Sequence, residues 1–396
     1  MKHNKNKKGN FPNLRFPEFE GEWEKRKLGE DCEIQMCKRI FASETTEDGD
    51  VPFYKIGTIG KVADTYISQE LYEEYKEKYN FPQKGEILIT CSGTIGKCVI
   101  YNGKDAYFQD SNIVWINNPS NMLINKFLYY FMSQVNWAHL NSTTITRIYN
   151  DNLRNLEISF PFQEEQHKIA TFLTLIDKRI ETQRKIIEDL ESLKSAINIK
   201  LFDGALAANM PPFWKPVKLS EVLSIPEKVK PQYIDKDKLL TVKLHLNGVM
   251  KNDNTDTLSL GATNYYIRRK GQFIFGKQNI FNGAFDIIPD ELDSYLSSAD
   301  VPSLDINTSK IHSLFLLYYF SREKFYKPLE DIAIGSGSKR IHETTILNLK
   351  IYLPTWEEQS LIANTLWTLE RKTNLELKIL QFMQKEKEYF LDNMFI

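Results

Sequence analysis

The sequence predicts an α+β protein with an internal duplication, in which two β-rich globular domains alternate with two long helices. The segment 155–202 recurs without a gap at 348–395, with 14 of 48 positions identical, whereas ordinary residue usage gives roughly three. Each copy contains a long helical pattern, and short β-rich runs precede that pattern both times. Globule, helix, globule and helix therefore follow one another along the chain.

The repeated segment has the same three parts in both copies. A strand-like run ends at a proline (NLEISFP and NLKIYLP), an acidic Glu-Glu-Gln follows, and the helical pattern comes next. The identical positions in the first copy are Asn155, Leu156, Ile158, Pro161, Glu164, Glu165, Gln166, Ile169, Ala170, Leu173, Lys185, Ile186, Lys194 and Phe202.

Both helical patterns carry apolar residues at alternating steps of four and three. Eight of ten such positions from Ile169 to Leu201 are apolar, and seven of ten from Ile362 to Met394. Since a stripe repeating every 3.5 residues must be buried against another helix, we expect the two copies to pair as a coiled coil. The alternative is two unrelated surface helices, which the matching Lys194 and Lys387 disfavour.

The helices should pair in opposite directions. Each globule precedes its helix, so parallel helices would crowd both globules at one end. About 38 residues at 1.5 Å each make a rod of about 57 Å. In an antiparallel pair Gln183 and Glu376 would form a polar layer near its middle, a common device for fixing register. Thr355 with Glu358 predicts a capping box where the second helix begins.

The first globule reads as short strands with turn residues between them. VPFYKIGTIG, GEILITCSG, KCVIYNG and SNIVWINN are strand-like, and helices are expected around 69–78 and 126–134. The second globule begins near MPPFWKP and echoes the first. Trp23 and Leu28 correspond to Trp214 and Leu219, KGEILI to KGQFIF, LYYF at 128 to LYYF at 317, and Arg147-Ile148 to Arg340-Ile341. The predicted regions are a disordered basic tail (1–13), globules at 14–160 and 204–353, and helical regions at 161–203 and 354–396.

Composition narrows the class of protein. The formal net charge is −1, so only local basic patches could steer the chain to nucleic acid. Cys32, Cys37, Cys91 and Cys98 fit no zinc ribbon, and reduced thiols in a cytoplasmic protein are expected. No signal peptide follows the basic N-terminus, and no apolar run is long enough for a membrane span.

Catalytic motifs are weak or absent. CSGTIGKC has Cys91 where a phosphate loop needs its first glycine and Cys98 where it needs Ser or Thr. NNPS at Asn117 is an incomplete match to the Asn-Pro-Pro-aromatic motif of amino-methyltransferases. Pro289-Asp290 is followed by an acidic-x-Lys sequence only far away and inside a predicted helix, as at Glu376. The six histidines form no ligand cluster, so we predict no catalysis, metal or cofactor for this chain.

At this point the chain resembles a known family. FPxFxxxWxxxxL at Phe16–Leu28 and the strand-Pro-x-x-Glu-Glu-Gln-x-x-Ile-Ala junctions at Pro161 and Pro354 are similar to those of type I restriction-modification specificity (S) subunits, and the resemblance extends from Leu14 to Phe395. It implies two target-recognition domains and two conserved helical regions packed as an antiparallel coiled coil. Each domain would read one half of a split, asymmetric double-stranded DNA site with a fixed-length spacer.

The resemblance also implies partners. Two modification subunits, which methylate adenine with S-adenosylmethionine, would dock on the helices and globules. Restriction subunits with ATP-driven translocase and nuclease activity would join them. S-adenosylmethionine, ATP and Mg are then expected on the partners and not on this chain, which would be non-catalytic. A coiled-coil adaptor that binds only proteins is the alternative, and a fused nuclease or methyltransferase is disfavoured by the missing motifs.

Polar loop residues are the candidates for contact with bases and phosphates. In the first globule they are Lys55, Thr58, Ser92, Thr94, Lys97, Gln109, Asn112, Thr143, Thr144, Thr146 and Arg147. In the second they are Lys243, Lys277, Gln278, Asn279, Asn282, Ser336, Ser338, Lys339 and Arg340. Each could equally be a solvated loop residue, and Arg147 and Arg340 could instead tie the last loop to the helix junction.

Overall fold

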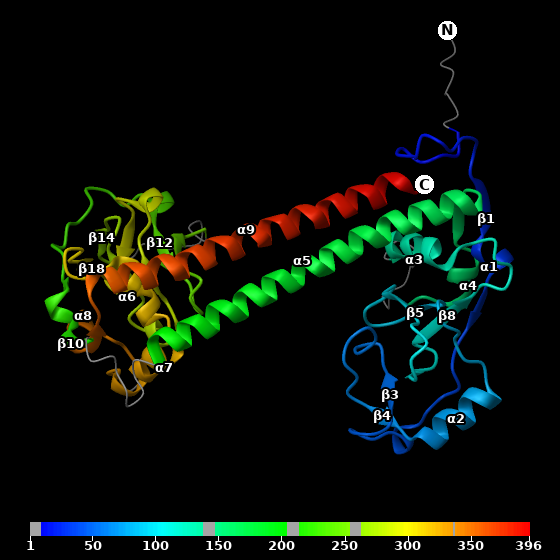
Figure 1. The fold of residues 1–396 in the computed structure, drawn as a ribbon, viewed down its shortest axis with the longest axis horizontal. Helices are drawn as coiled ribbons and strands as arrows, with labels where there is room; N and C mark the ends of the chain where they lie inside the picture. Colours follow the sequence, from blue (N-terminus) through cyan, green and yellow to red (C-terminus); the bar gives the residue numbers. More distant parts are fainter. Residues whose placement is uncertain (1–8, 138–146, 204–213, 254–262, 336) are drawn as a thin grey trace, which may run out of the picture. The chain divides into compact units, whose positions relative to one another are not determined.

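The computed structural model describes residues 9–137, 147–203, 214–253, 263–335 and 337–396. By compactness the chain divides into two units, Met1–Arg184 with Lys378–Ile396 and Lys185–Leu377. Each unit contains one globule together with one part of each long helix (Figure 1).

The two long helices are α5 (Gln163–Asp203) and α9 (Trp356–Met394), of 41 and 39 residues. All twenty positions of the two predicted apolar seams are buried or half-buried, which explains the 3.5-residue spacing. Thr355 caps α9 as expected, because its Oγ1 accepts a hydrogen bond from the backbone N–H of Glu358 at 3.3 Å.

The helices pair antiparallel, as predicted. In the first unit the Phe172 and Phe390 ring centroids lie 4.9 Å apart, and Lys387 Nζ lies 2.5 Å from Asp177 Oδ1, so numbers rise along α5 as they fall along α9. In the second unit Lys194 of α5 pairs with Glu370 of α9 at 3.2 Å. Lys194 and Lys387, which match in the repeat, thus bind the acids Glu370 and Asp177, which also match.

A tyrosine of each globule joins these ion pairs. The Tyr130 hydroxyl donates to Asp177 Oδ2 at 2.8 Å, and the Tyr318 hydroxyl donates to Glu370 Oε2 at 2.7 Å. Burial raises the pKa of both phenols above the usual value, so they stay protonated donors. Each unit therefore links its globule to both long helices through one tyrosine, one acid and one lysine.

The globule of the first unit is built on a four-stranded sheet of order β2-β8-β5-β6. Two smaller sheets, β1-β9 and β4-β3-β7, complete it. The strands are β1 (Glu24–Lys27), β2 (Glu33–Gln35), β3 (Val51–Tyr54), β4 (Tyr66–Ile67), β5 (Ile87–Thr90), β6 (Cys98–Ile100), β7 (Tyr107–Phe108), β8 (Ile113–Asn117) and β9 (Glu157–Phe160). The helices are α1 (Leu28–Asp31), the 3-10 turn η1 (Ala42–Glu44), α2 (Gln69–Lys78), α3 (Asn125–Gln134) and α4 (Asn150–Arg154). The predicted strands and the two predicted helices are all present.

The four-stranded sheet separates two hydrophobic clusters, because neighbouring residues of a strand point to opposite faces. Ile87 and Ile89 of β5 pack into the cluster that contains α3, the start of α5 and the end of α9. Leu88, between them, packs with Trp115 and Tyr107 into the cluster under β3, β7 and α2.

The globule of the second unit repeats this plan. Its four-stranded sheet has the order β11-β18-β15-β16, and β10-β19, β12-β13 and β14-β17 are two-stranded. The strands are β10 (Lys215–Lys218), β11 (Leu223–Ser224), β12 (Leu240–Val242), β13 (Val249–Lys251), β14 (Tyr265–Ile267), β15 (Phe273–Phe275), β16 (Phe285–Ile287), β17 (Leu296–Ser298), β18 (Ser303–Ile306) and β19 (Lys350–Leu353). The helices are α6 (Ser313–Phe320), α7 (Glu323–Tyr326) and α8 (Glu343–Asn348), with 3-10 turns η3 (Leu219–Glu221), η4 (Lys236–Lys238), η5 (Ile280–Asn282), η6 (Asp290–Leu292) and η7 (Lys327–Ile332).

Equivalent backbone contacts confirm that the globules are related. The N–H of Leu28 donates to the Leu156 carbonyl, and the N–H of Leu219 donates to the Leu349 carbonyl, both at 2.9 Å. The repeated Gln of the junction also has one role in both copies. Gln166 Oε1 accepts from the Ile124 N–H and Gln359 Oε1 accepts from the His312 N–H, each at 2.8 Å, so each glutamine fixes the start of α3 or α6.

One predicted correspondence is out of register by one residue. If LYYF at 128 matched LYYF at 317, Tyr130 would correspond to Tyr319. The contacts instead match Tyr130 to Tyr318, since these two hydroxyls bind the repeated acid of the long helices. The neighbouring aromatic contact agrees: Trp23 meets Phe127 and Trp214 meets Phe315, with ring centroids 5.9 and 6.0 Å apart.

Candidate DNA interface

The loop after β5 folds back on itself. Thr90 Oγ1 accepts a hydrogen bond from the Lys97 N–H at 3.0 Å and donates to the Thr94 carbonyl. Gly93 and Gly96 have φ of 66° and 75°, in the left-handed region that glycine adopts without strain. The loop leads into strand β6, whereas a phosphate loop leads into a helix, so CSGTIGKC is a hairpin turn.

Several predicted contact residues of the first globule meet beside this loop. Ser92 Oγ donates to Asn112 Oδ1 at 2.7 Å. Arg147 Nη2 donates to the Ser111 carbonyl at 2.9 Å, and the guanidinium lies 6.0 Å from the centroid of the Tyr149 ring. The Ile148 N–H binds the Cys91 carbonyl at 2.9 Å. Residues from three separate segments thus form one cluster.

The other candidates of the first globule surround this cluster. Lys97 Nζ donates to the Ile59 carbonyl, which brings the turn containing Thr58 against the hairpin. Thr58 Oγ1 accepts from the Lys55 N–H at 3.0 Å. Gln109 Oε1 is buried and accepts no hydrogen bond within the described part of the chain. Thr143, Thr144 and Thr146 lie outside the described residues.

The second globule forms the equivalent cluster from equivalent segments. The Ile341 N–H donates to the Lys277 carbonyl at 2.9 Å, and the Lys277 N–H donates to the Asp300 carbonyl at 2.9 Å. These bonds correspond to those of Ile148 and Cys91, with Cys91 in turn bonded to Asn112 at 2.8 Å. The two globules therefore present the same backbone frame with different side chains.

The remaining candidates of the second globule lie on loops that adjoin this frame. The N–H of His245 donates to the Asn282 carbonyl at 2.8 Å, so the exposed Lys243 lies on a segment held against the loop of Asn279. Asn282 Nδ2 donates to Asn279 Oδ1 at 3.4 Å. Gln278 is half-buried and Ser338 exposed, whereas Ser336 lies outside the described residues.

Most of the candidate cations already have partners inside the protein. Lys55 pairs with Asp64 at 3.2 Å, Lys339 with Glu330 at 2.9 Å and Arg340 with Asp300 at 3.4 Å. These pairs are largely exposed, where an ion pair contributes about 0–1 kcal/mol, so a phosphate could replace the carboxylate at little cost. Arg147 contacts the turn that precedes β8, and Arg340 contacts the turn that precedes β18. The two arginines thus make equivalent contacts from equivalent positions.

Lys277 is a different case. Its Nζ lies 3.0 Å from Glu343 Oε2, and both side chains are only 12% exposed. Burial raises the pKa of Glu343, but hydrogen bonds from its own backbone N–H and from Lys277 outweigh burial and leave the pKa below its usual value. This pair holds α8 to the loop after β15, and DNA contact by Lys277 stays a prediction.

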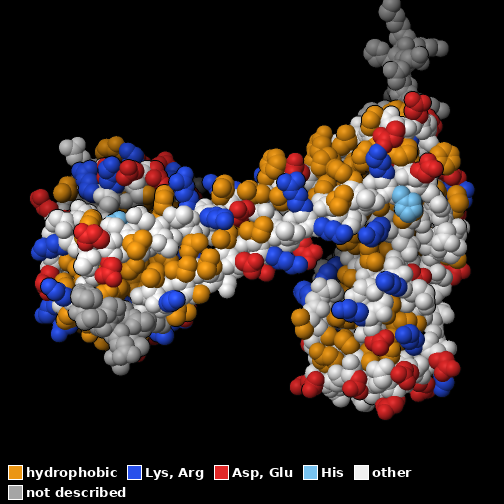
Figure 2. Space-filling model, viewed as in Figure 1, with side chains coloured by type: hydrophobic (Ala, Val, Ile, Leu, Met, Phe, Trp, Pro, Cys, Tyr) orange, Lys and Arg blue, Asp and Glu red, His pale blue; other side chains and the backbone are white. Residues whose placement is uncertain are grey.

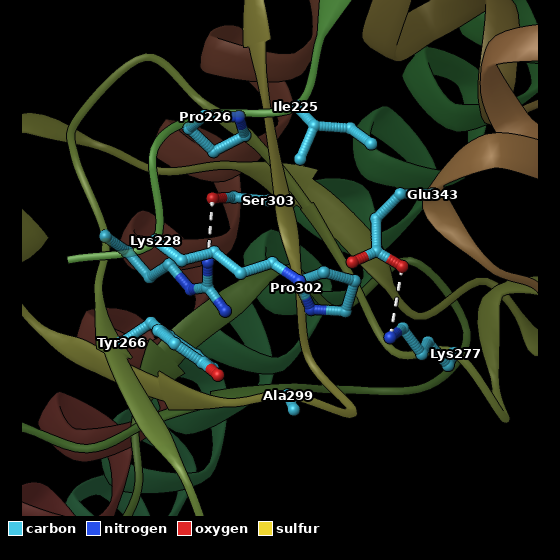
Figure 3. Close-up of a pocket in the computed structure, with 10 residues that line it drawn as sticks. Ile225, Pro226, Lys228, Tyr266, Lys277, Ala299, Pro302, Ser303 and Glu343 are labelled. Atoms are coloured by element: carbon cyan, nitrogen blue, oxygen red, sulfur yellow. Dashed lines mark hydrogen bonds and ion pairs between the residues drawn. The ribbon is translucent and has the colours of Figure 1, made fainter. Parts of the chain in front are cut away.

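Sequence reasoning missed three side chains next to Lys277. Lys228, Tyr266 and Arg268 line a surface hollow that Lys277 and Glu343 also line (Figure 3). The run Arg268-Arg269-Lys270 was a signal for a local basic patch. It adjoins a strand, however, whereas the predicted DNA-contact residues were chosen from loops.

The described residues contain no evident metal site and no reactive thiol. Among the described residues, no group of three or more His, Cys, Asp and Glu side chains could hold a metal ion. All four cysteines are free, and burial raises the pKa of Cys32, Cys37 and Cys98 to about 12 and that of Cys91 to about 11, which leaves them as unreactive thiols. None of the helices in the described part of the chain is long and apolar enough to cross a bilayer.

Comparison with known proteins shows the family to which this chain belongs. Residues 20–192 and residues 211–383 each match the type I restriction modification DNA specificity domain. The chain belongs to this family. It is a specificity subunit: it recognises DNA in a type I restriction-modification system and is not itself the enzyme.

Individual relatives agree with this assignment. A putative type I restriction enzyme specificity subunit of Haemophilus influenzae is 53% identical over 146 residues, which are 37% of this chain and 38% of the relative. A putative specificity subunit of Methanocaldococcus jannaschii is 24% identical over 98% of this chain and 96% of its own length. The crystal structure of the S subunit from M. genitalium, at 17% identity, covers 98% of this specificity subunit and 99% of its own chain with a TM-score of 0.63, and so has the same fold.

Proposed function

We propose that this specificity subunit reads a bipartite, asymmetric site in double-stranded DNA, one half with each globule. The globules at 14–160 and 204–353 act as target-recognition domains, and the helical regions at 161–203 and 354–396 set the length of the spacer between the half-sites. The observation that supports this is the equivalent loop frame in the two globules, which carries Cys91 and Asn112 in one and Lys277 and Asp300 in the other. One frame with two sets of side chains suits two related readers with different targets.

The proposal includes partner subunits. Two modification subunits that methylate adenine dock on the helices and globules, and restriction subunits join the complex in the cytoplasm, so S-adenosylmethionine, ATP and Mg are bound by the partners. Exposed apolar side chains on α9 support such docking, because apolar side chains left exposed on a helix can be buried by a partner. In the second unit Leu361, Trp367 and Leu375 are 68%, 43% and 57% exposed, and Figure 2 shows hydrophobic side chains among charged ones along the long helices.

Co-purification with candidate modification subunits, followed by genome-wide sequencing of methylated adenines, tests the proposal. The expected motif has two specified halves separated by unspecified bases. Arg147→Ala should alter preference at one half only and Arg340→Ala at the other, each lost base contact costing about 1–3 kcal/mol. Lys178→Ala, on an exposed position of α5, is the matched control and should change neither half. A continuous motif, or an Arg147 variant that alters both halves equally, would contradict the two-reader proposal.

A further inference from the structure

A surface hollow in the second globule has an excess of positive charge. Strand β14 supplies Tyr266, and the segment that follows it supplies Arg268. Lys277 points toward Glu343 across one side of the hollow, while Lys228 and Tyr266 lie on the opposite side (Figure 3). With three cations and one acid around it, the hollow carries a formal charge of +2.

Arg268 is the deepest of these cations. It is 4% exposed, and its guanidinium donates to Ser297 Oγ at 2.6 Å, Ser303 Oγ at 3.4 Å and the carbonyls of Ser298 and Val301 at 3.3 and 3.1 Å. All of these acceptors are neutral, and no carboxylate of the described residues lies within ion-pair distance. Burial lowers the pKa of Arg268 to about 10, which still leaves the side chain charged at neutral pH. The charge of Glu343 acts in the opposite direction but does not outweigh burial, so this guanidinium is only partly compensated and an additional anion in contact with it would be favourable.

The other cations differ in how far they are neutralised. Lys277 is compensated by Glu343 at 3.0 Å. Lys228 is exposed, its Nζ lies 6.0 Å from the centroid of the Tyr266 ring, and it pairs with no acid in the described ranges. The side chain of Lys228, at the edge of the hollow, can therefore move to contact a bound anion. The buried guanidinium of Arg268 supplies a charge at a fixed position below that anion.

The first globule has a hollow at the equivalent place. It is lined by Ser111, Val114, Arg147 and Asn150, among others. The matching backbone bonds of Ile148 and Ile341 make Asn150 the equivalent of Glu343. The matching strand pairs make Val114 the equivalent of Pro302. Each globule thus has a hollow beside its predicted contact loops, and among the described lining residues the nearly fully buried guanidinium is that of Arg268 in the second globule.

We propose that the hollow of the second globule binds one phosphate oxyanion, and that this oxyanion is a backbone phosphate of the DNA half-site that the globule reads. The assignment rests on the proposed function. A phosphodiester would add negative charge to a hollow with an excess of cations, and Lys228 and Lys277 of its lining are further donors for its oxygens. Phosphate contacts fix register on the duplex without reading bases, so the hollow positions the globule while the neighbouring loops read sequence.

The test uses the specificity subunit in complex with its modification subunits and a duplex that carries the site read from methylated adenines. Lys228→Ala should weaken binding about fivefold at moderate salt, equally for matched and mismatched sites. The slope of log K against log salt should become shallower by about one, as expected when one phosphate contact is lost. Lys350→Ala, an exposed lysine of the same globule, is the control and should bind as the unsubstituted chain does. Lys228→Arg should restore binding.

Uncharged methylphosphonate linkages, placed one at a time across the second half-site, locate the contact. One position should weaken the unsubstituted complex and have no further effect on Lys228→Ala. Arg268→Met should lose the same contact, and thermal unfolding shows whether that variant is folded. An unchanged salt slope in Lys228→Ala with an intact methylation motif would overturn this inference and leave the proposed function standing. Stabilisation by inorganic phosphate that needs Lys228, with unchanged DNA binding, would overturn the assignment to DNA.

Discussion

Exchanging the charges of Lys387 and Asp177 tests whether the repeated lysine and acid fix the register of the long helices. Lys387 Nζ lies 2.5 Å from Asp177 Oδ1, and the side chains are 25% and 35% exposed. Asp177 also accepts the Tyr130 hydroxyl at 2.8 Å. Lys387→Asp sets two carboxylates side by side, whereas Asp177→Lys sets two ammonium groups together and removes the charged acceptor of Tyr130, which leaves the Thr174 hydroxyl at 3.3 Å.

The expected magnitudes follow from this half-exposed setting. A partly exposed ion pair contributes about 0.5–1 kcal/mol, and a like-charge pair costs a similar amount. Lys387→Asp should therefore lower the free energy of unfolding by about 1–2 kcal/mol. Asp177→Lys should cost about 2–3 kcal/mol, because the Tyr130 hydroxyl loses a charged acceptor as well. The double variant restores opposite charges and keeps only the loss at Tyr130, so it should be about 2–4 kcal/mol more stable than the sum of the single changes implies.

Urea unfolding of the four proteins in this cycle measures the coupling. Lys178→Asp is the matched control, because Lys178 is exposed on α5 next to Asp177. Combined with Lys387→Asp it should give an additive result. The same cycle at Lys194 and Glu370, whose Nζ and Oε1 lie 3.2 Å apart, should show a coupling of the same sign. Additivity within about 0.3–0.5 kcal/mol for Asp177 and Lys387 would refute the idea that this pair fixes the register.

Three further predictions concern the junction, the buried ion pair and the spacer. Gln166→Ala should lower the unfolding free energy by about 2–4 kcal/mol in urea, since it leaves the Ile124 N–H unpaired, while the exposed His167→Ala should be nearly neutral. The lowered pKa of Glu343 means that its ion pair stabilises the protein above the ordinary carboxyl pKa of about 4.3. That stability is lost as pH falls through the lowered value, so Glu343→Gln should differ most from the parent near neutral pH and least in acid-unfolding experiments. Four helical residues inserted within 195–200 of α5 add about 6 Å, and should lengthen the spacer of the methylation motif by about two base pairs without changing either half. An unchanged spacer in an active variant would show that α5 does not set the distance.

The long helices could be predicted because their apolar pattern follows from a single physical requirement, the burial of one stripe of side chains. Every seam position has to be shielded from water, so the stripe is visible in the sequence even where the residues of the two copies differ. The LYYF correspondence was wrong for the opposite reason. Because two tyrosines are consecutive, the two sequences still align tyrosine with tyrosine after a shift of one residue. That shift nevertheless turns each side chain by about 100° around a helix. Contacts with Gln166, Trp23 and Asp177 decide between the two registers, and all three come from other segments of the chain.

The candidate site was predictable only as a set of loops. Turn residues between strands mark where the loops are, but they do not show which charges are already neutralised. Lys277 and Glu343 stand 66 positions apart in the sequence, and their pairing depends on how α8 meets the loop after β15. Arg268 was missed because its environment consists mainly of main-chain carbonyls and serine hydroxyls. Such an environment has no recognisable sequence motif.

The two copies differ where recognition is expected and agree where the helices are held. Gln166 and Gln359 make the same hydrogen bonds, and the same tyrosine, acid and lysine recur in both units. Arg147 and Arg340 hold equivalent backbone positions, yet one binds the Ser111 carbonyl and the other pairs with Asp300. A change of side chain on this frame alters what faces outward without disturbing the contacts that hold the helices. The proposed function therefore predicts that each globule can change its target while the contacts that hold the helices stay the same.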